Sequence, residues 1–169
     1  VASLSLAVAL TVMVASFRDS MIAWLDAVLP APLYLRTAGS AGRADAAPLP
    51  ADLAPRIAAL PGVQRAQPMR STSLWLSPDR PAVSLLLRPL HGPQGQQLPW
   101  IQGPVQAPAG STPVYVSEAV AQLYGVRPGQ EWPLLAQALP SEDSRVFVAG
   151  IWRDYVRQFG AIAMDWDDY

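Results

Sequence analysis

The first part of the chain is apolar on every side. Residues 1–16, VASLSLAVALTVMVAS, contain no charged side chain. As a helix, this run is about 24 Å long at a rise of 1.5 Å per residue, slightly short of the roughly 20 residues that cross a bilayer core. Three structures fit this length: the end of a longer transmembrane helix, the apolar part of a signal peptide cleaved near Ala15-Ser16, and a buried helix of a soluble protein.

The residues after the apolar run favour the transmembrane helix. Arg18, Asp19 and Asp26 lie on one face of a continued helix, and apolar side chains recur on the other face at steps of three and four. This change is expected where a membrane helix emerges into water against a folded domain. We therefore predict a stalk whose apolar face packs on that domain. The face consists of Phe17, Met21, Trp24, Leu25 and Val28.

Two prolines divide the chain. Pro30 and Pro32 end the helical pattern, so residues 1–29 are predicted as the end of a membrane helix with its stalk, and residues 30–169 as a separate domain. Trp24 could alternatively lie among lipid headgroups, where Trp is common. Packing of its ring against the domain is the simpler interpretation.

The domain is predicted to be α+β, with short strands and two short helices. One helix is predicted at residues 51–60, and the other at residues 118–124 between Ser117 as N-cap and Gly125 as C-cap. The predicted strands are residues 33–36, one or two strands within 63–76, 82–88, 114–116, 131–135 and 145–151. Residues 90–112 are rich in Gly and Pro and are predicted as a long irregular connection.

Composition excludes several kinds of chemistry. The net charge of −1 argues against a nucleic-acid partner, which needs a basic surplus. Without Cys the chain has no thiolate metal site or thiol nucleophile, and without Lys it cannot supply a P-loop. The one histidine, His91, lies in a Pro/Gly loop with no nucleophile elbow nearby, so we interpret it as an ordinary loop residue.

Polar groups cluster after the last long apolar run. Residues 146–151 lead directly into Trp152, Arg153, Asp154 and Tyr155, and three more acids follow at Asp165, Asp167 and Asp168. The acids lack the spacing of an EF-hand, and neighbours on a loop do not define an acid–base pair. Asp154 is predicted to accept backbone hydrogen bonds in a turn. We predict no catalytic residue, no cofactor-binding residue and no metal ligand.

Four segments together resemble the extracytoplasmic domain of FtsX-like, MacB-type ABC transporter permeases. They are SFRDSMIAWLDAVLPAPLYLR at 16–36, ADLAPRIAALPGV at 51–63, VYVSEAVAQLYGVRPGQEWPL at 114–134 and VAGIWRDYVRQFGAIAMDWDDY at 148–169. The resemblance lies in their order and spacing and covers most of the chain, with residues 90–112 matching poorly. The last segment is similar to the family's strand, Asp-Tyr turn, glycine and second strand, which makes Asp154 and Gly160 turn residues.

The resemblance implies a non-enzymatic part of a transporter in the cytoplasmic (inner) membrane, facing the periplasm. ATP hydrolysis would belong to a separate cytoplasmic ATP-binding subunit, two permease copies would pair, and no cofactor is implied. The domain would handle an envelope substrate or partner protein, with membrane lipid around the helix. Candidate contacts for that partner are Trp100, Trp152 and Tyr155.

Two other functions fit parts of the sequence. A secreted or periplasmic binding module would use the apolar run as a signal or anchor and some of the six Trp residues as stacking surfaces. A hydrolase would use His91 or the terminal acids, but neither lies in a recognisable motif.

Overall fold

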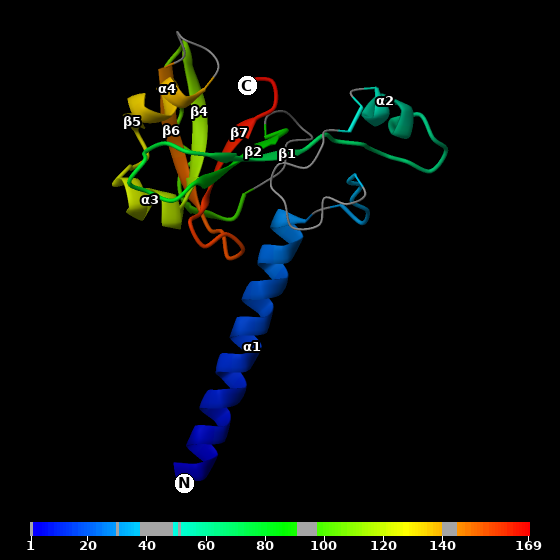
Figure 1. Cartoon of the computed structure of the whole chain (residues 1–169). Coiled ribbons are helices and arrows are strands. Elements are labelled where there is room, and N and C mark those ends of the chain that lie inside the picture. The colour runs from blue at the N-terminus through cyan, green and yellow to red at the C-terminus, as the bar shows by residue number, and fades with distance from the viewer. Residues whose placement is uncertain (1, 30, 38–48, 51, 91–97, 140–144) are drawn as a thin grey trace.

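A computed structural model describes residues 2–29, 31–37, 49–50, 52–90, 98–139 and 145–169. A long N-terminal helix precedes a mixed sheet with short helices, so the predicted α+β class is confirmed (Figure 1). The elements are α1 (Ala2–Val28), α2 (Leu53–Ala58), β1 (Arg70–Leu74), β2 (Val83–Arg88), β3 (Trp100–Gln102), β4 (Ser111–Ser117), α3 (Glu118–Tyr124), β5 (Gln130–Glu131), α4 (Pro133–Ala138), β6 (Arg145–Trp152) and β7 (Ala161–Asp165).

Within the described residues, the strands form one sheet in the order β1-β2-β7-β4-β6-β3, with β5 paired to β6. The pairs β2–β7 and β4–β6 are parallel, and the other pairs are antiparallel. Strand β7 therefore lies between β2 and β4 although it is last in the chain. Its five residues are all buried, as expected for a central strand covered on both faces.

The two faces of the sheet carry two separate apolar clusters. In β4, Val114 and Val116 join the cluster under α3 and α4, whereas Tyr115 joins the cluster on the opposite face. Strand β7 alternates in the same way, with Ile162 on the first face and Ala163 on the second. The alternation follows from the two-residue period of a strand, so continuous apolar runs in β4 and β7 serve both clusters.

Helix α3 matches its prediction in detail. The Ser117 Oγ accepts a hydrogen bond from the Val120 backbone N–H at 3.4 Å, and Gly125 ends the helix at φ 68°. Both signals are local, since a short polar side chain satisfies a free N–H at the start and glycine adopts the left-handed conformation at the end.

Several predicted strands are wrong or shorter. Residues 33–36 form no strand, because their side chains are exposed and no strand in the described part of the chain pairs with them. Within residues 131–135, β5 ends at Glu131 and Pro133 begins a helix, a position where its missing N–H costs nothing. Within residues 63–76 the strand is limited to β1, and the irregular segment 90–112 contains β3 and the start of β4.

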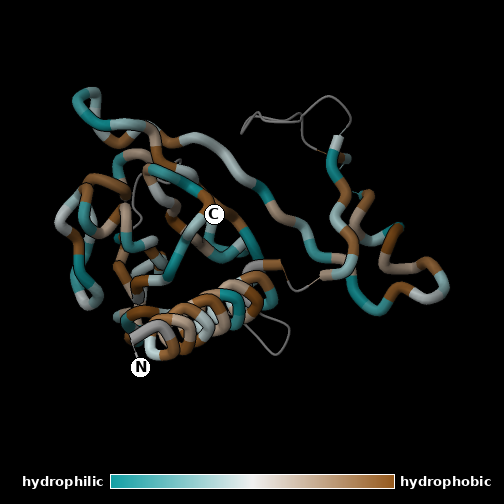
Figure 2. The backbone as a smooth tube through the Cα atoms, turned by 90° about the horizontal axis from the view of Figure 1, so that it is seen from below, coloured by the Kyte–Doolittle hydropathy of each residue, from teal (hydrophilic) through white to brown (hydrophobic). Residues whose placement is uncertain are grey.

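Helix α1 is long and apolar enough to cross a membrane or to serve as a signal sequence. Its candidate span is Leu4–Asp26, 23 residues, and none of the span's apolar window is buried by the rest of the chain. It therefore does not pack as a core helix of the domain. Hydrophobic residues predominate along this helix (Figure 2), which projects away from the domain (Figure 1).

Tyr115 should make stability sensitive to alkaline pH. Burial raises the pKa of Tyr115 above its usual value of 10.0, and the carboxylates of Asp168 and Asp165 raise this pKa further. Because the folded-state pKa is raised, this contribution to stability is complete below pH 10 and is lost as pH rises through the folded-state pKa. We expect Tyr115→Phe to reduce the loss of stability above pH 10, measured by denaturant unfolding across a pH series.

Candidate functional site at the helix–domain junction

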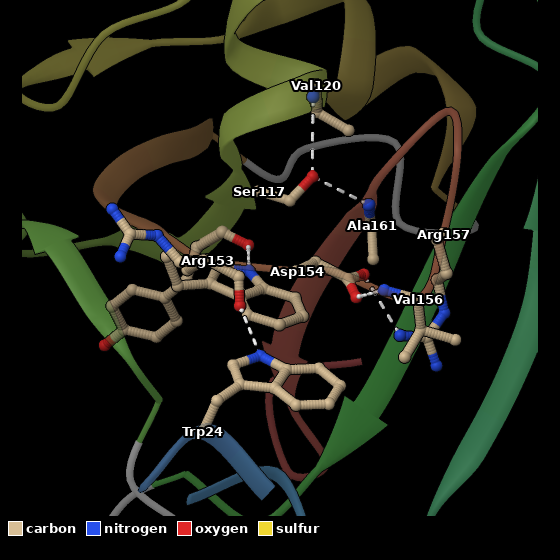
Figure 3. A network of polar contacts seen from close by, with 10 residues as sticks. Trp24, Ser117, Val120, Arg153, Asp154, Val156, Arg157 and Ala161 are labelled. Carbon is tan, nitrogen blue, oxygen red and sulfur yellow. Dashed lines mark hydrogen bonds and ion pairs between the residues drawn. The ribbon is translucent and has the colours of Figure 1, made fainter. Parts of the chain in front are cut away.

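The Trp24 side chain holds the end of α1 on the domain. The Trp24 side chain is 6% exposed, and its Nε1–H donates a hydrogen bond to the Arg153 carbonyl oxygen at 3.1 Å (Figure 3). Its ring also meets the Tyr155 ring edge-on, with centroids 5.4 Å apart. Both partners belong to residues 153–160, which connect β6 to β7 and are called the junction loop below. Trp24 therefore packs on the domain, as its position in the helical pattern predicted.

The other residues of the predicted stalk face contribute less. Phe17 is 68% exposed and Leu25 41% exposed, while Met21, one turn before Trp24, is half-buried. The side chain of Val28 lies outside the described residues. The contact is narrow because α1 projects away from the domain, so that the earlier turns have nothing to pack against (Figure 1).

The junction loop is folded around Asp154. One carboxylate oxygen accepts a hydrogen bond from the Val156 backbone N–H at 3.0 Å, and the other pairs with an Arg157 guanidinium nitrogen at 3.1 Å (Figure 3). The Asp154 side chain is only 1% exposed and that of Arg157 29% exposed. The hydrogen bond from Val156 is the one expected of an aspartate in a turn. The ion pair with Arg157 is a second contact that holds the loop.

Removing this carboxylate should loosen the loop. We expect Asp154→Ala to lower the free energy of unfolding by about 1–3 kcal/mol, because a buried charged hydrogen-bonding group is lost. Asp154→Asn should cost less, because its side-chain oxygen can still accept from Val156. Chemical denaturation of the three proteins checks the ranking, and equal losses from alanine and asparagine would mean that the turn bond contributes nothing.

Ser117 ties the end of the loop to the sheet. Besides capping α3, its Oγ accepts a hydrogen bond from the Ala161 backbone N–H at 2.9 Å, and Ser117 is completely buried (Figure 3). The adjacent Gly160 has φ 79°, and its N–H donates to the Arg157 carbonyl oxygen at 2.9 Å. One hydroxyl thus joins the end of β4, the start of α3 and the start of β7. The hydrogen bond from Ala161 joins residues 44 positions apart in the sequence, so no local sequence pattern predicts it.

The three predicted partner contacts fall in different environments. Trp152 is a correction: it is 0% exposed and its Nε1–H donates to the Tyr115 carbonyl oxygen at 3.2 Å, so it is a core residue and not a surface contact. Its burial follows from the pairing of β6 with β3 and β4, which the sequence did not reveal. Trp100 is 38% exposed and edge-on to the Tyr115 ring, and Tyr155 is 54% exposed in the junction loop.

The acidic residue at the end of β7 accepts hydrogen bonds from backbone N–H groups. Asp165 is 3% exposed, and its carboxylate oxygens accept hydrogen bonds from the N–H groups of Leu90 at 2.6 Å and Asp167 at 3.0 Å. Among the residues that the structure describes, no three His, Asp or Glu side chains are close enough to hold a metal ion. His91 lies outside the described residues. The Trp24 contacts join the end of α1 to the loop between β6 and β7, two strands that lie on either side of β4 in the sheet.

Comparison with protein-family models, with curated proteins and with solved structures finds no match for this chain.

Proposed function

We propose that this chain is the extracytoplasmic domain and stalk of an FtsX-like, MacB-type ABC transporter permease in the cytoplasmic membrane. Its role would be to couple ATP-driven motion of the membrane helices to an envelope substrate or partner protein. One observation carries the proposal: α1 runs without a break from an apolar span into the Trp24 contact with the domain.

A continuous helix suits the transmission of motion. Its 27 residues correspond to about 40 Å at 1.5 Å per residue, and no proline interrupts it. Motion of the membrane end would arrive at the junction loop through Trp24. The loop connects β6 directly to β7, so a pull on it acts on two strands within the sheet.

The remaining parts of the transporter would lie elsewhere in the assembly. A cytoplasmic ATP-binding subunit would hydrolyse ATP, and a second permease copy would complete a dimer within membrane lipid. The domain would contribute binding and movement without chemistry of its own. Trp100 and Tyr155 are exposed aromatic side chains available for contacts.

The proposal is tested by the location and topology of the full-length protein. In a background otherwise free of cysteine, we expect Gln122→Cys, an exposed position on α3, to react with a membrane-impermeant maleimide in intact cells with a permeable outer layer. The protein should also remain in the membrane after alkaline extraction, with residues 1–16 still attached in mass spectrometry.

Two outcomes would contradict this proposal. A product released in soluble form without residues 1–16 would support the binding module with a signal peptide instead. Labelling of Gln122→Cys that requires lysis of the cells would place the domain in the cytoplasm. A purified complex in which a P-loop ATPase hydrolyses ATP would support the transporter assignment.

A further inference from the structure

The junction loop exposes three apolar side chains within five residues. Tyr155 is 54% exposed, Val156 66% and Phe159 47%. None of them belongs to either apolar cluster of the sheet. Apolar side chains gathered on one surface loop commonly mark a site of contact with a protein or a membrane.

The junction loop is held in a fixed shape by hydrogen bonds and an ion pair. Asp154 is tied to Val156 and Arg157, and the Gly160 N–H is bonded to the Arg157 carbonyl oxygen at 2.9 Å. The loop is therefore held in a shape that keeps its apolar side chains on the surface.

The position of the junction loop relative to α1 indicates what contacts the exposed apolar side chains of the loop. The loop hangs from the sheet on the side from which α1 leaves the domain, and lies beside the last turns of this helix (Figure 1). Trp24, which touches Arg153 and Tyr155, falls within the candidate span Leu4–Asp26. If this span crosses a bilayer, the loop lies at the level of the membrane surface.

The same conclusion holds if the helix leaves the lipid earlier. From Arg18, the first charged residue, to Trp24 is six residues, or about 9 Å along a helix. The polar headgroup layer on one side of a bilayer is about 5–8 Å thick. Trp24 would then stand close to the outer edge of the headgroups, and a loop reaching down beside the helix would meet them.

The charges around the loop suit a lipid surface. Arg153 is exposed and its guanidinium lies 5.9 Å from the centre of the Tyr155 ring. Because Arg157 is paired with Asp154, the loop keeps a surplus of one positive charge at Arg153. Tyr is enriched at both membrane–water interfaces, and a positive charge near the surface is attracted to any anionic headgroup.

We propose that the junction loop is a membrane-contacting element, whose Tyr155, Val156 and Phe159 side chains enter the headgroup layer of the bilayer crossed by α1. Arg153 faces anionic lipid in this arrangement. The inference rests on the proposed function, because it requires α1 to span the membrane. Trp24 is then enclosed by the loop, and the aromatic side chains that meet lipid are those of Tyr155 and Phe159.

The test uses depth-dependent quenching in the full-length protein. Single cysteines at Val156, at Gln122 on α3 and at Val12 in α1 carry an environment-sensitive fluorophore, in nanodiscs of phosphatidylcholine with a minor share of phosphatidylglycerol. Lipids spin-labelled at the headgroup or near the acyl-chain end serve as quenchers. We expect headgroup-labelled lipid to quench the probe at 156 several-fold more than the probe at 122, and the deep label to quench the probe at 12.

The three probe positions distinguish failure of the junction-loop proposal from failure of the proposed function. If the probe at 12 is quenched while those at 156 and 122 respond equally weakly, the loop proposal is overturned and the membrane position of α1 stands. If the probe at 12 is not quenched in the correctly assembled nanodisc, the proposed function itself fails. Weaker quenching at 156 without phosphatidylglycerol, restored by adding it, would support the role of Arg153.

Discussion

Replacing Gly160 by alanine is expected to lower the free energy of unfolding by roughly 2–5 kcal/mol, the sum of backbone strain and overpacking. Gly160 has φ 79°, a conformation that L-residues with a Cβ rarely adopt. The added Cβ would also stand 2.2 Å from the Ser117 Oγ, 2.9 Å from the Val120 Cγ2 and 3.0 Å from the Ala119 Cβ. Denaturant or thermal unfolding of the variant measures this loss.

Gly110 provides a matched control. Its φ is 78°, almost identical to that of Gly160, but an added Cβ there meets no atom within 4 Å. Gly110→Ala should therefore show only the backbone strain of about 1–2 kcal/mol. The difference between the two variants isolates the close approach of Gly160 to Ser117 and α3. Equal losses would mean that the crowding around Gly160 is relieved without cost.

Local signals account for the part of the fold that the sequence predicted well. The Ser117 cap and the Gly125 end of α3 depend on backbone groups a few residues away, and the apolar run of β6 depends only on burial. The turn at Asp154 is also local, since its carboxylate accepts from a backbone N–H two residues on.

Features decided by distant partners were not predicted. Trp152 stands at the polar end of β6, where it looked like a surface residue, but pairing of β6 with β3 and β4 encloses it. The second bond of Ser117, to Ala161, exists because β7 lies beside β4. In the helix, the same periodic pattern included Trp24 and Phe17, yet Trp24 is buried against the domain while Phe17 is 68% exposed.

The second large effect concerns Trp24. Truncation of a buried aromatic side chain costs about 3–5 kcal/mol, and Trp24→Ala also leaves the Arg153 carbonyl oxygen without its donor. We expect this variant to release the end of α1 from the junction loop while the sheet remains folded. Spin labels on cysteines at Val12 and Gln122 of the full-length protein should report a distance distribution clearly broader than that of the parent. Trp24→Phe should be intermediate, because it keeps a ring for Tyr155 and loses the N–H.

Phe17→Ala is the control on the same helix. Phe17 is 68% exposed and contacts neither apolar cluster, so its loss should leave the distance distribution unchanged. Broadening by both variants would point to a general weakening of α1. An unchanged distribution in Trp24→Ala would mean that this contact does not hold the helix on the domain. Under the proposed function, release at Trp24 should allow ATP hydrolysis to continue while movement of the domain is lost, because the contact would lie between the membrane helices and the domain.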